Sequence, residues 1–151
     1  MLTPCCSLIT AGGMLTPRLV QSMRDSAPVL LTVDAQGQLE KYRNVDVLKC
    51  NAADASAYLR RDLRTKTDFT EAAHDLCADL EAVVTVIITR GADGATLCTA
   101  DGQVHHCPSP IVTDVYDTVG AGDTAIAVTT LALAAGASPY EAVMLANVAS
   151  G

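Results

Sequence analysis

Three short runs of apolar residues, set among segments with the hydrophobic spacing of helices, constrain the fold of this chain more than any other feature. The runs lie at 28–33, 45–50 and 83–88. The run at 28–33 is apolar at almost every position, which is typical of a strand buried on both faces of a parallel sheet, and the other two are candidate strands. The order of elements predicts one α/β domain spanning residues 1–151, with a three-layer, Rossmann-like, mostly parallel sheet flanked by helices.

A β-hairpin is predicted after the third run. Residues 95–99 and 103–107 each have the pattern of a strand, and Asp101-Gly102 between them is typical of a tight hairpin turn. We therefore expect an antiparallel addition to the parallel sheet.

Helix starts are indicated by residues that cap helices. Thr16 precedes Pro17, which suits a hydroxyl N-cap followed by proline in the first turn. Asp68, followed by an acidic residue three positions later, predicts a capped start for the helix before the third run. Ser138 with Glu141 predicts a capped start for the last helix.

Composition limits the classes of partner. The net charge is −7 and the isoelectric point is about 4.7, which argues against binding to nucleic acids or to acidic membranes. No stretch approaches the roughly 20 apolar residues of a membrane span, and no basic segment typical of a signal peptide precedes the apolar start. We expect a cytoplasmic protein that would have to hold a polyphosphate with backbone N–H groups and a metal ion.

The cysteines and histidines do not form a metal-binding pattern. The six cysteines include no C-x-x-C pair, and their spacing predicts scattered buried thiols in a reducing compartment. His105 and His106 are adjacent in a predicted strand, so their side chains should point to opposite faces and cannot readily share one ion.

A glycine-rich turn that opens a helix is the most informative segment for function. It reads D-T-V-G-A-G-D-T over residues 117–124 and is followed by an unbroken helical run. Gly120 and Gly122 allow a sharp turn and a close approach by a ligand. The N–H groups of Ala121, Gly122 and Asp123 should then be unpaired donors at the positive end of a helix, which favours an anion.

Asp123 would repel an anion that was merely bound there. Its position makes chemical sense if the carboxylate receives a proton from a hydroxyl that attacks a phosphate. The alternative is that Asp123 is a first-turn residue that only complements the helix dipole.

The whole segment resembles the signature D-T-x-G-A-G-D of the ribokinase-like (PfkB) carbohydrate kinases. The resemblance implies that Asp123 is the catalytic base. It also implies that Gly120, Ala121 and Gly122, with Asp123, form an anion hole for the transferred phosphoryl group of ATP, beside the nucleotide-binding residues Asp117 and Thr118.

Further segments appear in the order that this family has them. Asn51-x-x-Asp54 resembles the N-x-x-E motif that helps to organise Mg²⁺ and the phosphates, with Asp54 in place of Glu and able to reach the metal through a water. Thr89-x-Gly91-x-x-Gly94 resembles the loop that lines the ATP phosphates, and Asn147 falls in the part that borders the adenine pocket. Outside this context, Asn51 is more often a turn residue, and the glycine loop is equally a plain turn into the hairpin.

Within the family, the chain is most similar to the heptose 7-phosphate kinases. The similar segments are L-T-P at 15–17, V-D-x-x-G at 33–37 and D-T-A-I-A at 123–127. Gln36 stands where those kinases have lysine. The resemblance implies an ATP-dependent kinase whose partner is a small sugar or sugar phosphate.

The resemblance covers nearly the whole chain but only the carboxy-terminal half of the family fold. The amino-terminal half, which supplies most sugar contacts and the lid, has no counterpart here, so we expect feeble or no turnover by this polypeptide alone. A second copy of the chain, or a separate amino-terminal half, is a candidate protein partner. The alternatives are a non-catalytic nucleotide-binding fragment, a pseudokinase half, and a different Rossmann-like enzyme. The last lacks support because neither G-x-G-x-x-G after the first strand nor G-x-x-x-x-G-K-S/T occurs.

Overall fold

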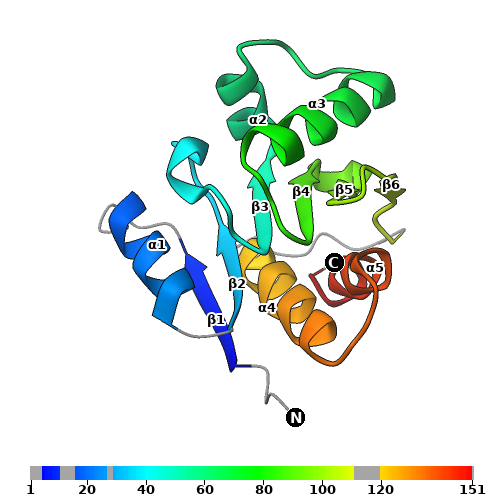
Figure 1. The fold of residues 1–151 in the computed structure, drawn as a ribbon. Coiled ribbons are helices and arrows are strands. Elements are labelled where there is room, and N and C mark those ends of the chain that lie inside the picture. The colour runs from blue at the N-terminus through cyan, green and yellow to red at the C-terminus, as the bar shows by residue number, and fades with distance from the viewer. Residues whose placement is uncertain (1–4, 11–15, 27–28, 111–119, 151) are drawn as a thin grey trace.

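A computed structural model describes residues 5–10, 16–26, 29–110 and 120–150, which form a six-stranded sheet flanked by helices (Figure 1). The strands lie in the sheet in chain order, and β1 to β4 run parallel while β5 and β6 are antiparallel additions. Their bounds are β1 (Cys5–Thr10), β2 (Val29–Asp34), β3 (Val47–Asn51), β4 (Thr85–Thr89), β5 (Ala95–Thr99) and β6 (Val104–Cys107). The predicted α/β class, mostly parallel sheet and hairpin are confirmed.

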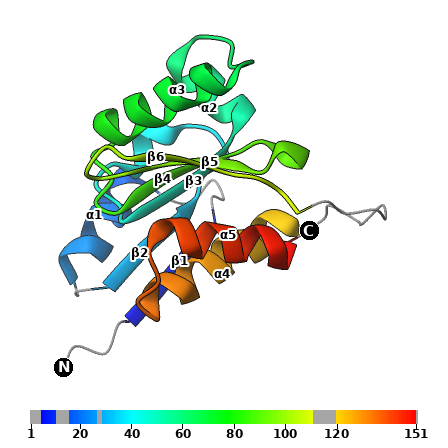
Figure 2. The ribbon, with the colours of Figure 1, turned by 90° about the vertical axis from the view of Figure 1, so that its right-hand side faces the viewer.

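Helices cover both faces of the sheet and give three layers. Figure 2 shows α2 and α3 above the sheet and α4 and α5 beneath it. The bounds are α1 (Pro17–Ser26), α2 (Ala52–Leu59), α3 (Lys66–Asp79), α4 (Ala121–Ala134) and α5 (Pro139–Ser150), with 3-10 turns η1 (Leu39–Tyr42) and η2 (Gly91–Asp93).

The sheet separates two apolar clusters, and β3 contributes to both. Leu48 belongs to the larger cluster with Leu76 of α3, whereas Val47 belongs to the smaller one with Ile126 of α4 and Val143 of α5. Because successive strand residues point to opposite faces, the α4 face of β3 carries every second residue from Val47 onward. Two polar residues, at positions 49 and 51, therefore share that face.

The start of α3 differs from the prediction. Asp68 is not the N-cap but the third helical residue, and Thr65 is the N-cap. The Thr65 hydroxyl accepts from the Asp68 N–H at 3.2 Å, and the Asp68 carboxylate accepts from the Thr65 N–H at 2.7 Å. A Thr-x-x-Asp pair satisfies two helix-terminal donors reciprocally, whereas a cap at Asp68 would leave the donors of the preceding turn unpaired.

The starts of α1 and α5 are confirmed. The Thr16 hydroxyl accepts from the Leu19 N–H at 3.3 Å. The Ser138 hydroxyl accepts from the Glu141 N–H at 3.3 Å, and the Glu141 carboxylate accepts from the Ser138 N–H at 2.9 Å. The first and the last helix of the chain thus begin where the capping patterns predict.

Strand β1 is absent from the predicted elements. It pairs in parallel with β2 along its whole length, from Cys5 opposite Val29 to Thr10 opposite Asp34. Its sequence, C-C-S-L-I-T, mixes small polar and apolar residues without a period and lies close to proline and glycine. Pairing with β2 therefore stabilises this strand, which its local sequence pattern does not predict.

The two histidines of β6 point to opposite faces, as predicted. The His106 ring lies 3.1 Å from the Thr70 hydroxyl of α3 and 2.9 Å from the Thr96 hydroxyl. The His105 ring instead packs on Tyr140 of α5, with 5.3 Å between ring centroids. No group of three metal-ligating side chains occurs among the residues that the structure describes.

Candidate functional site

The carboxyl ends of β2, β3 and β4 meet at one edge of the sheet. Asp34 ends β2 and lies opposite Lys49, while Asn51 ends β3 and lies opposite Thr89. In open α/β sheets, ligands bind at the carboxyl ends of the strands, so this edge is the expected location of a site.

The predicted anion hole lies at the start of α4. Gly120 is the N-cap with φ +87° and has no side chain to cap the helix. The first helical bond runs from the Thr124 N–H to the Gly120 carbonyl at 2.9 Å, so the N–H groups of residues 121–123 precede the first residue that has an intrahelical acceptor. A positive φ of this size strongly favours glycine. Within the described part of the chain, these three N–H groups thus have no intrahelical acceptor, which is compatible with the predicted anion hole.

Asp123 is exposed in the first turn of α4. Within the described ranges, its carboxylate takes part in no ion pair or side-chain hydrogen bond. A carboxylate held neither by a cation nor by a donor is available to accept a proton from a bound hydroxyl.

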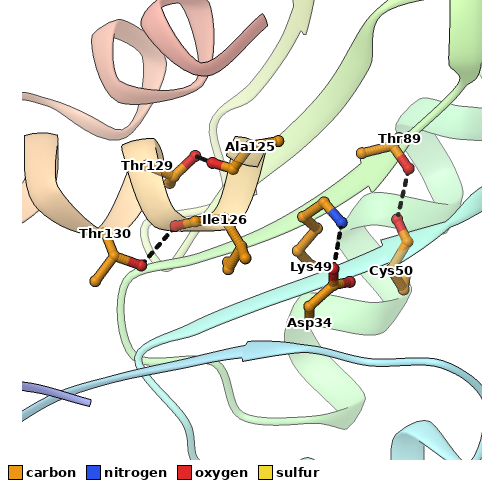
Figure 3. A network of polar contacts seen from close by, with 8 residues as sticks. All are labelled: Asp34, Lys49, Cys50, Thr89, Ala125, Ile126, Thr129 and Thr130. Atoms are coloured by element: carbon orange, nitrogen blue, oxygen red, sulfur yellow. Dashed lines mark hydrogen bonds and ion pairs between the residues drawn. The ribbon is translucent and has the colours of Figure 1, made fainter. Parts of the chain in front are cut away.

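A buried ion pair lies beside this turn and was missed by sequence reasoning. The Lys49 ammonium is 2.8 Å from a carboxylate oxygen of Asp34, and each side chain is only 8% exposed. Figure 3 shows the two side chains pointing toward each other from neighbouring strands, near α4. The available signal was a lysine inside the predicted strand 45–50, on the same strand face as Asn51.

Gly122 brings the helix against this ion pair. A Cβ at Gly122 would lie 3.3 Å from the Lys49 ammonium and 3.5 Å from the Asp34 carboxylate. Deeper in the helix, the hydroxyl of Thr130 lies 2.9 Å from that of Thr32, which fixes α4 to β2. The missing side chain at position 122 thus allows a charged pair to contact the first turn of α4.

A cleft of about 560 Å³ lies at the same edge of the sheet, next to α2 and the loop before α3. It brings together three of the predicted nucleotide-binding residues, Asn51, Thr89 and Gly91. Arg64 and Arg90 also line it, and the Arg90 guanidinium lies 5.2 Å from the centre of the Phe69 ring. The cleft therefore combines exposed backbone, polar side chains and two cationic groups.

Asn51 caps α2, and Asp54 stands one turn into that helix. The Asn51 side-chain oxygen accepts from the Asp54 N–H at 2.8 Å. One carboxylate oxygen of Asp54 is buried and has no hydrogen-bond partner among the described residues. A buried carboxylate oxygen without a donor is costly, and a cation or a cation-bound water would satisfy it. Oxygen donors of this kind suit Mg²⁺, so Asp54 fits the predicted metal role.

The loop after β4 contains two glycines in different surroundings. Gly91 is exposed, and the space where its side chain would lie is open. Gly94 is buried, and a Cβ there would lie 2.1 Å from the Cys107 carbonyl oxygen and 2.5 Å from the Ser109 nitrogen. Contact with the end of β6 therefore explains Gly94 without any ligand.

Asn147, another predicted nucleotide-binding residue, does not line the cleft. The Asn147 amide of α5 donates to the carbonyls of Cys107 at 3.1 Å and Pro108 at 3.2 Å, so it ties α5 to the end of β6. Asp117 and Thr118 lie outside the described residues.

The buried thiols are not candidates for chemistry. Cys50, Cys77, Cys98 and Cys107 are free and buried. Burial raises the pKa of Cys50 and Cys98 to about 12 and that of Cys107 to about 11. These thiols stay protonated near neutral pH and are neither nucleophiles nor metal ligands.

Comparison with known proteins gives the class of this fold and site. Residues 13–151 match the family described as pfkB family carbohydrate kinase. The chain belongs to the pfkB family of carbohydrate kinases.

Curated relatives carry the name Bifunctional protein HldE. The chain is 38% identical over 145 residues to that protein of Geotalea uraniireducens (strain Rf4), covering 92% of this chain and 29% of the relative. It is 37% identical over 145 residues to that of Hyphomonas neptunium (strain ATCC 15444), covering 93% of this chain and 29% of the relative. The chain thus spans less than a third of these relatives.

Solved structures show the same arrangement. A mutant of phosphofructokinase-2 from Escherichia coli superposes with a TM-score of 0.85 and 25% identity over 99% of this chain and 51% of that protein. Ribokinase of Arabidopsis thaliana, complexed with ribose and ATP, superposes with a TM-score of 0.81 and 22% identity over 96% of this chain and 48% of that protein. The chain spans about half of each structure. None of its described helices is both long and apolar enough to cross a membrane.

Proposed function

We propose that this chain carries the phosphoryl-transfer half of an ATP-dependent kinase that acts on a hydroxyl of a sugar or sugar phosphate. The carrying observation is the start of α4, where backbone donors and an Asp123 carboxylate that have no partner among the described residues lie together beside a buried ammonium. Membership of the pfkB family supports this chemistry.

Asp123 takes the role of general base. Its carboxylate accepts the proton of the attacking hydroxyl while that oxygen forms its bond to the γ-phosphorus. The N–H groups of residues 121–123, which follow the turn at Gly120, stabilise the charge on the transferred phosphoryl group. Removal of one such donor typically costs on the order of 10²–10³ in rate.

The cleft between Asn51 and Gly91 is the proposed site for the polyphosphate, with Thr89 between them. Asn147 lies on the side where we place the adenine. Asn51 and Asp54 would hold Mg²⁺, which neutralises charge on the β- and γ-phosphates when bound. Among the acceptors, a heptose phosphate is favoured because three segments of the sequence resemble heptose 7-phosphate kinases. The orphaned Asp54 oxygen supports the metal assignment.

The test is the substitution Asp123→Asn, in a form of the protein that also carries the amino-terminal half of the fold. We expect Mg-ATP binding by calorimetry to be retained and ADP release across a panel of sugars and sugar phosphates to fall by about 10² or more. Asp79→Asn, at another exposed aspartate, is the matched control and should change neither. Retention of most activity by Asp123→Asn would overturn the assignment.

A nucleotide-binding role without catalysis is the second candidate, favoured because the chain spans only about half of its solved relatives. Calorimetry with Mg-ATP and a coupled ADP-release assay on the same polypeptide separate the two. Binding with no turnover, even when the amino-terminal half is supplied, would favour this candidate.

A further inference from the structure

Lys49 is the only buried cationic residue in the part of the chain that the structure describes. Removing an ammonium from water is expensive, and a partner carboxylate offsets the cost only when the geometry is good. A single ion pair with Asp34 at 2.8 Å provides that partner. The pair stands at the proposed phosphoryl site rather than in the middle of the core.

The place of this ammonium is electrostatically unfavourable by itself. It lies beside the first turn of α4, where the helix dipole and the free N–H groups are positive. A cation and a helix N-terminus repel each other, and both attract an anion. Asp34 is the anion that the protein supplies, because its carboxylate contacts the ammonium and also lies close to Gly122.

We propose that Asp34 is a positioning residue that acts as a built-in counter-anion for the phosphoryl site, and that Lys49 is the group it holds ready. Without nucleotide, Asp34 neutralises both the ammonium and the helix end. When a phosphoryl group reaches the α4 turn, Lys49 shares its charge between Asp34 and the phosphoryl oxygens. This inference rests on the proposed function. It gives a role to Asp34, which lies in the V-D-x-x-G segment, and to Lys49, which none of the sequence motifs contains.

The proposal predicts opposite effects for the two halves of the pair. Asp34→Asn removes the competing negative charge, so Mg-ATP and inorganic pyrophosphate should bind several-fold more tightly. Lys49→Met leaves a carboxylate facing the anion and removes a charged donor, so the same ligands should bind more weakly by on the order of tenfold or more. A pair that served only to hold β2 and β3 together would weaken binding in both variants.

Calorimetry on the 151-residue chain, with Mg-ATP and with pyrophosphate, measures these affinities. Thermal unfolding of each variant separates lost stability from lost affinity. The control is Asp46→Asn, which alters the part-buried pair of Arg24 and Asp46 at the amino end of β3. It should lower stability without changing either affinity.

The double variant Asp34→Asn/Lys49→Met keeps the test usable where a single variant does not fold, because it leaves no unpaired buried charge. It should bind both ligands more weakly than the unsubstituted chain but more tightly than Lys49→Met. Shifts of the two single variants in the same direction, or a double variant that binds like the unsubstituted chain, would overturn the proposal while leaving the proposed function standing. Absence of nucleotide binding by the unsubstituted chain would overturn both.

Discussion

At the scale of single residues, a different local constraint explains each of three glycines near this edge of the sheet. Gly120 has φ +87° and open space around it, so backbone conformation alone favours glycine. Gly94 combines φ +81° with carbonyl and amide groups at contact distance. Gly122 has an ordinary helical conformation, and only the tips of Asp34 and Lys49 limit its size. Substitution by alanine should therefore have three different outcomes.

Gly94→Ala should be severely destabilising. The new methyl group would overlap the Cys107 carbonyl, at 2.1 Å, in a conformation that alanine disfavours. Backbone must move to relieve the overlap, so we expect a loss of several kcal/mol or failure to fold. Gly91→Ala is the matched control, because φ is +59° but the space is open, and it should cost about 1–2 kcal/mol. Chemical denaturation of both variants measures the difference, and equal losses would contradict this account.

Gly122→Ala should leave stability nearly unchanged while weakening nucleotide binding. Alanine is favoured over glycine within a helix by roughly 0.5–1 kcal/mol, which offsets the crowding of a flexible lysine tip at 3.3 Å. The displaced ammonium would no longer meet the turn in the same position. Urea denaturation and Mg-ADP calorimetry on one sample measure both quantities. A large loss of stability would show that the Lys49 side chain cannot move away from the new methyl group.

At the scale of elements, the helix starts combine structural and functional roles. The same Asn51 side chain caps α2 and lines the cleft, whereas the Thr65 cap of α3 lies outside it. A cap is worth about 1 kcal/mol, so the two helices offer a matched comparison.

Asn51→Asp should keep the N-cap of α2 and weaken binding of the nucleotide. Asparagine and aspartate are similar N-caps, so the free energy of unfolding should change by less than about 0.5 kcal/mol. The added negative charge faces the proposed polyphosphate, so the affinity for ATP measured without Mg²⁺ should fall, whereas a carboxylate is itself a good ligand for Mg²⁺. Thr65→Ala is expected to show the reverse, with about 1 kcal/mol of stability lost and the affinity kept. Two variants that move stability and affinity together would show that the cleft does not bind the nucleotide.

The start of α5 predicts a dependence of stability on pH. Hydrogen bonds from Ser138 hold the pKa of Glu141 below its ordinary value of 4.5. Since the folded pKa is lower than the unfolded one, the stabilisation is complete above pH 4.5 and is lost as pH falls through the folded pKa. Thermal unfolding from pH 6 to pH 3 should therefore decline less steeply in Glu141→Gln than in the unsubstituted chain. An identical slope would contradict this expectation.

Local sequence patterns predicted most elements because their causes are local. Apolar runs identified β2, β3 and β4, and the turn at Asp101-Gly102 identified the hairpin. Strand β1 was not predicted because pairing with β2, rather than its own sequence pattern, orders it. Several strand boundaries also shift; for example, the run predicted from residue 45 begins as a strand only at Val47.

The candidate site was predictable only where a motif lies within one segment. The turn before Asp123 and the Asn51 cap each depend on residues a few positions apart. The Asp34–Lys49 pair depends on the register between two strands, and its contact with Gly122 joins positions 73 residues apart. Topology creates that constellation, and no local period indicates it.

At the scale of the whole molecule, the fold has about half the extent of its solved relatives. The other half of their fold has no counterpart in these 151 residues. We expect the polypeptide alone to bind Mg-ATP and to release ADP slowly or not at all, because the half of the fold expected to close over the γ-phosphate and exclude water is the half without a counterpart here. A coupled assay with and without a sugar phosphate measures this. Turnover comparable to that of a complete kinase would contradict the expectation.

The sequential order of the strands has a consequence for how the molecule assembles. Each strand lies next to its neighbour in the chain, so the sheet can extend during synthesis without a strand waiting for a distant partner. Among the described helices, α4 covers strands that are especially distant in the chain, because it returns from beyond β6 to contact β1 and β2. Since α4 lies against Asp34 and Lys49, we expect this ion pair to stay hydrated until α4 packs on the sheet.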